Sequence, residues 1–179
     1  MRAFIGLGIP ESVKDRIIDA ERLLEGPGIV LVKREALHIT LHFLGDVEEG
    51  KLEMLESIME SVKHSSFSIS IEGAGAFGGK DPHVVYLKIG IGSAEIISIY
   101  DDLSRKLREA GMRTEGRLFT PHVTIARVKH GADTKKIEGA IERIGSMDFG
   151  SFGNPELFIK KSVLTPDGPL YTTLFSRSL

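Results

Sequence analysis

Two short stretches of the chain, Leu37-His38-Ile39-Thr40-Leu41 and Pro121-His122-Val123-Thr124-Ile125, carry the same pattern of a histidine and a threonine among apolar residues. This alternation of polar and apolar residues predicts two β-strands. Side chains alternate between the two faces of a strand. We therefore expect each stretch to present one imidazole and one hydroxyl on one face and apolar residues on the other.

The segments around these two stretches follow the same order in both halves of the chain. Periodicity predicts strands over residues 2–7, 29–32, 37–44, 66–71, 83–91 and 118–128, and helices over residues 10–24, from 45–46 to about 62, 93–110 and 133–144. Matching elements lie roughly 82 to 87 residues apart. This spacing favours an internal duplication, although any chain that alternates helices and strands can show a similar pitch.

A glycine-rich stretch over residues 72–82 indicates a turn or a crossover between the halves. The last third of the chain adds expected strands over residues 148–152, 157–164 and 170–176, with hairpin turns between them. The pattern thus predicts an α+β fold with two antiparallel sheets flanked by helices.

Composition narrows the class of protein. The 179 residues suit a single domain covering residues 1–179, with a core of its own. A formal charge of -2 gives no overall positive field to attract nucleic acid, and the absence of cysteine excludes disulfides, cysteine–zinc sites and thiol nucleophiles. No apolar run approaches the roughly 18 residues of a membrane span, and no signal-peptide pattern follows Met1, so we expect a cytoplasmic protein without membrane contact.

Two imidazoles and two hydroxyls suit in-line attack at a phosphodiester. One histidine can take a proton from the attacking oxygen while the other protonates the departing oxygen. The ordinary pKa of histidine lies close to working pH, which suits both roles. The threonine hydroxyls, Thr40 and Thr124, can donate hydrogen bonds to the phosphate oxygens that gain negative charge in the transition state.

The stretches His38-Ile39-Thr40-Leu41-His42-Phe43-Leu44-Gly45 and Phe119-Thr120-Pro121-His122-Val123-Thr124-Ile125-Ala126-Arg127 resemble the paired signatures of the 2H phosphoesterase superfamily, and specifically of the RNA 2′,3′-cyclic phosphodiesterases, also called 2′-5′ RNA ligases. The resemblance covers essentially the whole chain. It implies an α+β fold of two lobes related by a pseudo-twofold axis, with a central active-site cleft. It also implies hydrolysis of RNA 2′,3′-cyclic phosphate ends to 2′-phosphomonoesters, with slow, reversible, ATP-independent 2′-5′ joining of RNA ends.

In that family the first motif's histidine, here His38, is the proton donor to the leaving 3′ oxygen, and the second, here His122, is the proton acceptor. The residues of this chain alone permit either assignment, because the halves are nearly symmetric. Arg127 matches a family position after the second motif, where it is expected to support the phosphate or the motif strand. Strict alternation would place it on the face opposite to His122, so it needs a β-bulge or the strand's end to reach the cleft, and otherwise it is a surface ion-pair partner.

The resemblance implies no cofactor and no metal, and a partner that is RNA with a 2′,3′-cyclic phosphate end, fragments of tRNA being one candidate. We expect a monomer. Two other hypotheses remain: a non-catalytic module that binds nucleotides or RNA ends, and a zinc hydrolase that uses His38, His42 and His122. The zinc hypothesis is weaker, because the first two lie in a strand and no glutamate stands between them as in a His-Glu-x-x-His helix.

Several neighbouring side chains have simpler expected roles. His42 follows the face of His38, which predicts a place in the cleft wall or in solvent. Phe43 and Phe119 are expected in the core. Basic residues precede both motifs and could guide RNA, although such runs more often form solvated helix faces; they are Lys33, Arg34, Arg105, Lys106, Arg108, Arg113 and Arg117.

Overall fold

A computed structural model describes residues 1–114, 118–166 and 168–179. Within these ranges the strands are β1 (Arg2–Leu7), β2 (Ile29–Leu31), β3 (Ile39–Asp46), β4 (Ser68–Phe77), β5 (Val84–Ile89), β6 (His122–Val128), β7 (Asp148–Gly153), β8 (Glu156–Thr165) and β9 (Gly168–Ser178). The helices are α1 (Glu11–Glu21), α2 (Leu52–Ser61), α3 (Ser93–Glu109) and α4 (Thr134–Gly145), with 3₁₀ turns η1 (Arg22–Leu24), η2 (Arg34–Ala36) and η3 (Glu49–Lys51). The α+β class expected from the sequence is confirmed.

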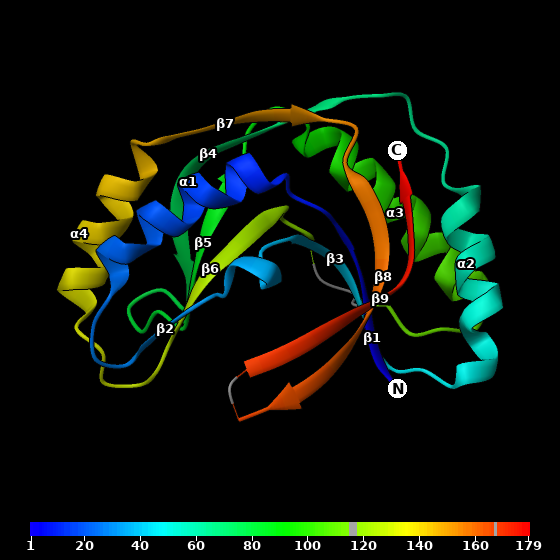
Figure 1. Cartoon of the computed structure of the whole chain (residues 1–179), viewed down its shortest axis with the longest axis horizontal. Helices are drawn as coiled ribbons and strands as arrows, with labels where there is room; N and C mark the ends of the chain where they lie inside the picture. Colours follow the sequence, from blue (N-terminus) through cyan, green and yellow to red (C-terminus); the bar gives the residue numbers. More distant parts are fainter. Residues whose placement is uncertain (115–117, 167) are drawn as a thin grey trace.

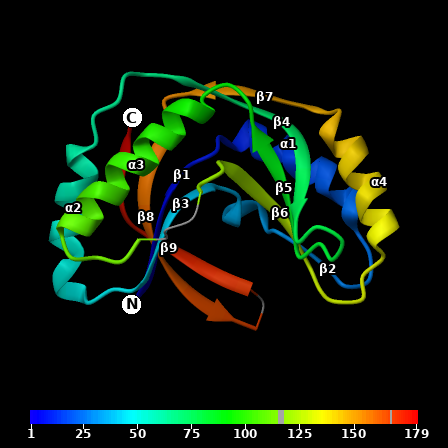
Figure 2. The ribbon, with the colours of Figure 1, turned by 180° about the vertical axis from the view of Figure 1, so that it is seen from behind.

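The strands form one curled antiparallel sheet in the order β7-β4-β5-β6-β3-β1-β8-β9, with β2 paired to β6. The two expected sheets are joined in the middle, where β3 and β6 share a single paired position, Ile39 opposite Val123. Figure 1 shows an arch with α1 and α4 over one half and α2 and α3 over the other, and Figure 2 shows the same arrangement from behind. The two motif strands therefore lie side by side at the centre of the arch.

The order of strands around this centre is symmetric. Reading outward from the β3–β6 contact, β6 is followed by β5 and β4, and β3 is followed by β1 and β8. These strands correspond in chain order: β1 to β5, β3 to β6 and β4 to β8, at an offset of about 82 to 88 residues. Such an order is what a twofold relation between two lobes produces.

The apolar stripes of the helices cover the outer side of the sheet. Val13, Ile17 and Ala20 of α1 are buried, as the period of 3.6 residues predicts. Helix α1 contacts β6 and β7, α4 contacts β4, and α3 contacts β3. Among the described residues no helix is long and apolar enough to cross a membrane.

Strand β4 extends further than the sequence indicates. It continues from Ser68 to Phe77, through part of the stretch that we expected to be a turn or crossover. Gly73 has a φ of +80° where the β4–β5 register shifts, so it sits in a bulge rather than in a turn. A Cβ on Gly75 would lie 2.9 Å from the Tyr86 ring, so glycine is needed there to admit that ring.

The buried carboxyl of Glu21, at the end of α1, should make stability depend on pH. Its side chain is only 4% exposed, and burial raises its pKa to about 8. Between pH 4.5 and about 8, Glu21 therefore keeps its proton in the folded chain and loses it in the unfolded chain, where the carboxyl pKa is ordinary. This contribution to stability is complete below pH 4.5 or so and is lost progressively as pH rises to about 8.

We predict that Glu21→Gln raises the melting temperature by about 5 °C relative to the wild type at pH 8.5, and changes it little at pH 5. Thermal unfolding across this pH range measures the difference. Glu25→Gln, at an exposed position four residues further on, is the control. Parallel pH curves for the wild type and Glu21→Gln would contradict the prediction.

Candidate active site

The four polar side chains of the two motifs lie together on the concave face of the arch. Ile39 and Val123 pair across the strands and are both fully buried toward the helices. Their neighbours on each strand point the other way. Continuing the antiparallel register places His38 opposite Thr124, and Thr40 opposite His122. The two imidazoles are thus brought to one surface from separate halves of the sheet.

Both histidine rings are held by the same kind of hydrogen bond. Nδ1 of His38 donates to the carbonyl oxygen of Ala36 at 2.7 Å, and Nδ1 of His122 donates to the carbonyl oxygen of Thr120 at 2.7 Å. A carbonyl can only accept, so the proton of each neutral ring is placed on Nδ1. Nε2 of each ring then carries the lone pair, and it is the nitrogen that can take or give a proton in chemistry.

Thr40 contacts the reactive nitrogen of its own motif. Its Oγ1 lies 2.8 Å from Nε2 of His38. In the neutral ring Nε2 is an acceptor, so the hydroxyl donates to it. When Nε2 gains a proton it becomes a donor, and the Thr40 hydroxyl is then able to donate to a bound phosphate oxygen instead.

Aromatic rings support each imidazole. The His38 ring lies 4.8 Å from the ring of Phe4, 5.9 Å from Phe158 and 5.8 Å from Tyr171. The His122 ring lies 5.1 Å from the ring of Phe77 and 5.3 Å from Tyr86, which themselves stack at 4.3 Å. Phe4 and Tyr86 come from corresponding strands, as do Phe158 and Phe77. Packing on both sides limits the rotation of each imidazole and fixes where its Nε2 points.

Burial lowers the pKa of His38 to about 4. The hydrogen bond to Ala36 opposes this shift, and the charges of Lys160, Lys14 and His122 add to it. His38 is therefore neutral at neutral pH until an anion binds beside it and favours its charged form.

We predict that Lys160→Met raises the pKa of His38, because it removes a nearby positive charge while keeping a long apolar side chain. The rise should leave the pKa below its usual range, because burial is the larger cause. Titration of the imidazole nitrogens by NMR measures the change. Lys161→Met, at the next position of β8, is the control; an equal shift in both variants, or none in Lys160→Met, would contradict the prediction.

A β-bulge brings Arg127 to the face of His122. In the β5–β6 register Tyr86 pairs with Thr124 and Val85 pairs with Ala126, so one residue of β6, Ile125, is unmatched. Ile125 and Ala126 are both buried, and Arg127 is exposed. The extra residue shifts the alternation by one position. Burial raises the pKa of Tyr171, and the positive charge of Arg127 partly offsets that rise.

Strand β3 carries a matching bulge, which corrects the expectations for His42 and Phe43. Gly6 pairs with Thr40 and Ile5 pairs with His42, so Leu41 is the extra residue. His42 is consequently buried, 2% exposed, against α3, where its Nε2 lies 3.1 Å from the carbonyl oxygen of Tyr100. It is not part of the cleft wall, because the bulge turns it to the other face.

Phe43 occupies the position in β3 that Arg127 occupies in β6, and it is 58% exposed rather than in the core. It pairs with Phe4, whose ring faces His38, and the rings of Phe43 and Phe4 lie 6.4 Å apart. Paired residues share a face of the sheet, so Phe43 presents an aromatic surface to the cleft. Phe119 behaves as expected and packs against the core, stacked on Tyr100 at 4.1 Å.

The zinc hypothesis is wrong, because its three histidines do not meet. His42 lies on the opposite face of the sheet from His38 and His122. Among the described residues, no group of three histidines or carboxylates is placed to hold a metal ion.

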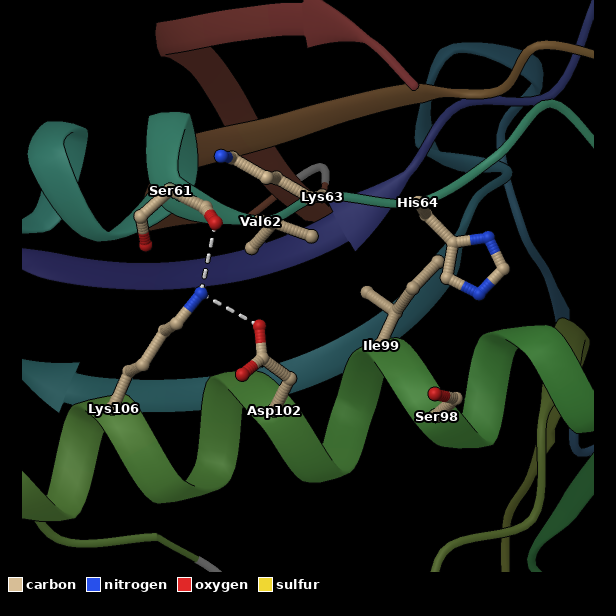
Figure 3. Close-up of a pocket in the computed structure, with 8 residues that line it drawn as sticks. All are labelled: Ser61, Val62, Lys63, His64, Ser98, Ile99, Asp102 and Lys106. Atoms are coloured by element: carbon tan, nitrogen blue, oxygen red, sulfur yellow. Dashed lines mark hydrogen bonds and ion pairs between the residues drawn. The ribbon is translucent and has the colours of Figure 1, made fainter.

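Three of the basic residues before the motifs, Arg34, Arg105 and Lys106, are held by carboxylates. Arg34 forms ion pairs with Glu11 and with Asp15, and Arg105 forms them with Asp102 and Glu109. Arg117 lies outside the described residues. In Figure 3, a hollow between the end of α2 and α3 holds Lys106, whose Nζ is bound by Asp102 at 2.7 Å and by the carbonyl oxygen of Ser61 at 3.0 Å. Arg105 and Lys106 belong to α3, on the outer side of the sheet, whereas Arg34 belongs to η2, which leads into the first motif.

Comparison with known proteins identifies a family whose model covers most of the chain. The model of the 2′-5′ RNA ligase superfamily matches residues 9–149. The RNA 2′,3′-cyclic phosphodiesterase of Methanocaldococcus jannaschii is 34% identical over 97% of this chain and 98% of its own, and that of Thermotoga maritima is 36% identical over 98% and 94%.

The architecture is also similar to solved structures. A Thermus thermophilus protein matches with a TM-score of 0.81 at 24% identity, over 100% of this chain and 98% of its own. Escherichia coli LigT in complex with 3′-AMP matches with a TM-score of 0.81 at 22% identity, over 99% and 97%. At these identities the likeness shows the fold.

Proposed function

The chain belongs to the 2′-5′ RNA ligase superfamily and is a hydrolase, and we propose that it opens 2′,3′-cyclic phosphates at the ends of RNA to give 2′-phosphomonoesters. The observation that supports this activity most directly is the paired geometry of the motifs. Two imidazoles with matching Nδ1–carbonyl bonds, each accompanied by a threonine hydroxyl, lie on one face where β3 meets β6. The relatives of the chain are named as phosphodiesterases, which favours an enzyme over a module that only binds nucleotides or RNA ends.

In the proposed reaction, Nε2 of His122 takes a proton from a water molecule as the water oxygen attacks phosphorus. The bond from phosphorus to the 3′ oxygen breaks, and protonated His38 gives its proton to that oxygen. Phosphorus stays attached to the 2′ oxygen, so the product is a 2′-phosphomonoester. Thr40, Thr124 and Arg127 hold the phosphate oxygens that gain charge.

Burial lowers the pKa of His38 to about 4, so the free ring carries no proton at neutral pH. To act as the acid it needs bound phosphate beside it, whose negative charge raises that pKa toward working pH. The phosphate anion supplies the compensating charge that lets the proton reside there. The same steps with a 5′-hydroxyl in place of water join two RNA ends through a 2′-5′ linkage, without ATP.

We predict that a defined RNA ending in a 2′,3′-cyclic phosphate yields only the 2′-phosphate, and that a chelator leaves the rate within about twofold. Chromatography against 2′- and 3′-phosphate standards identifies the product. Synthetic 3′-phosphate RNA, incubated with the protein, controls for migration of the phosphate. A 3′-phosphate product, or loss of activity with the chelator that added metal restores, would refute the mechanism.

A further inference from the structure

A groove of about 520 Å³ lies between the β8–β9 hairpin and the segment that leads into the first motif. Lys33 and Glu35 line it from the η2 side, and Thr165, Leu170, Tyr171 and Thr173 line it from the hairpin. Lys160 of β8 lines it as well. Figures 1 and 2 show the far part of the hairpin projecting away from the helices, below the arch. The groove is therefore open on the side of the molecule that the helices leave uncovered.

One end of this groove is continuous with the catalytic face. Tyr171, which lines the groove, has its ring 5.8 Å from the His38 ring. The charge of Lys160, also in the lining, acts on His38. A chain bound with its end at His38 can thus extend directly into the groove.

The lining suits a polyanion with attached rings. Lys33 and Lys160 are two ammonium groups, and Thr165 and Thr173 add hydroxyl donors. Nζ of Lys160 is held 4.3 Å above the Phe158 ring. Burial lowers the pKa of Lys160, and the positive charge of Lys14 lowers it further. Leu170 is 62% exposed at the rim. Crowded positive charge beside an exposed apolar surface complements a phosphate followed by a nucleoside. Among the described residues that line the groove, Glu35 is the one that is acidic.

The direction of the RNA follows from the proposed reaction. His38 protonates the 3′ oxygen, and this oxygen is carried by the ribose of the terminal nucleotide. The ribose and the rest of the RNA therefore lie on the His38 side of phosphorus, whereas water approaches from the His122 side.

We propose that the groove binds the nucleotide preceding the cyclic-phosphate end, with its linking phosphate between Lys33 and Lys160. The inference rests on the proposed function and adds a substrate class to it: RNA chains of two or more nucleotides, in preference to cyclic mononucleotides. Lys33 is the informative residue, because it is exposed and belongs to the far wall of the groove.

The test compares a cyclic-phosphate tetranucleotide with 2′,3′-cyclic AMP. Lys33→Ala should raise KM for the tetranucleotide about tenfold, the loss of one charge-assisted contact, and change kcat/KM for cyclic AMP less than twofold. Lys33→Glu should raise KM further, and the excess should disappear at high salt. Lys135→Ala, at an exposed position on α4, is the matched control and should leave KM and kcat/KM unchanged for both substrates.

Equal effects of Lys33→Ala on the kinetics of both substrates, or no effect on KM for the tetranucleotide, would overturn the proposal that the groove binds RNA. Failure of the proposed function is a separate result: the wild type would turn over neither substrate. The groove would then still be tested by the Kd of the tetranucleotide 2′-phosphate and of 2′-AMP. A wild-type preference for the longer ligand that Lys33→Ala removes supports the groove, and equal Kd values reject it.

Discussion

Replacing His38 or His122 by alanine should each lower kcat for RNA 2′,3′-cyclic phosphate hydrolysis by about 10³-fold, the usual contribution of one general acid or base. Each ring lies on the concave face and takes no part in the backbone pairing of the strands. Its removal therefore deletes a proton-transfer group while the sheet keeps its hydrogen bonds. Release of the 2′-phosphate from a labelled oligonucleotide measures kcat. His130→Ala, whose side chain is 95% exposed, is the control.

The double variant sharpens this prediction. Both imidazoles act on one transition state, so losing the second should cost at most about tenfold more than losing the first. Independent effects that multiply to about 10⁶-fold would mean that the rings serve separate steps. Wild-type activity in either single variant would remove the mechanism altogether.

The assignment of donor and acceptor can be tested with a substrate that needs no acid. Sulfur in place of the 3′ oxygen leaves as a thiolate, whose conjugate thiol has a pKa near 8.5, without help from a proton. His38→Ala should therefore recover most of its activity on the 3′-thio substrate, and His122→Ala should stay inactive. Recovery by His122→Ala instead would exchange the two roles.

Sequence periodicity predicts the elements and the motif pairs because both depend on local patterns. Val13, Ile17 and Ala20 are buried as the helical period requires, and His38 and His122 share a face with their threonines. The chemistry of the pair then follows from residue type. What periodicity cannot supply is the register between strands that are far apart in the chain, and with it the joining of the two expected sheets at Ile39 and Val123.

His42 and Phe43 show where the pattern fails. Strict alternation carries His42 to the face of His38 and leaves Phe43 pointing inward, but Leu41 is an extra residue opposite β1 and reverses both. Two adjacent buried residues, Leu41 and His42, are the signature of this bulge. The sequence does not reveal this bulge, because histidine occurs both on surfaces and in cores, so its type does not show that His42 is buried like Leu41.

The same shift makes Arg127 a cleft residue, and we predict that Arg127→Met lowers kcat/KM about 10²-fold. A guanidinium can bind two oxygens of the phosphate at once, whereas an ammonium offers only a point charge. Arg127→Lys should therefore recover part of the loss. Steady-state kinetics on a cyclic-phosphate oligonucleotide measures both variants, with Arg22→Met, a charge on the outer helix layer paired with Asp19, as the control.

The two lobes have the same fold but different proposed roles in catalysis. We therefore expect that moving the positive charge from position 127 to the equivalent position 43 does not restore activity. Phe43 and Arg127 follow equivalent bulges, yet Phe43 lies in the strand that follows the proposed acid His38, and Arg127 lies in the strand of the proposed base His122. If Arg127 acts by its place beside His122, adding Phe43→Arg to Arg127→Met should leave kcat/KM within about threefold of Arg127→Met alone. If the cleft needs only positive charge, the added arginine restores activity; an unchanged rate in Arg127→Met itself would make Arg127 a surface residue.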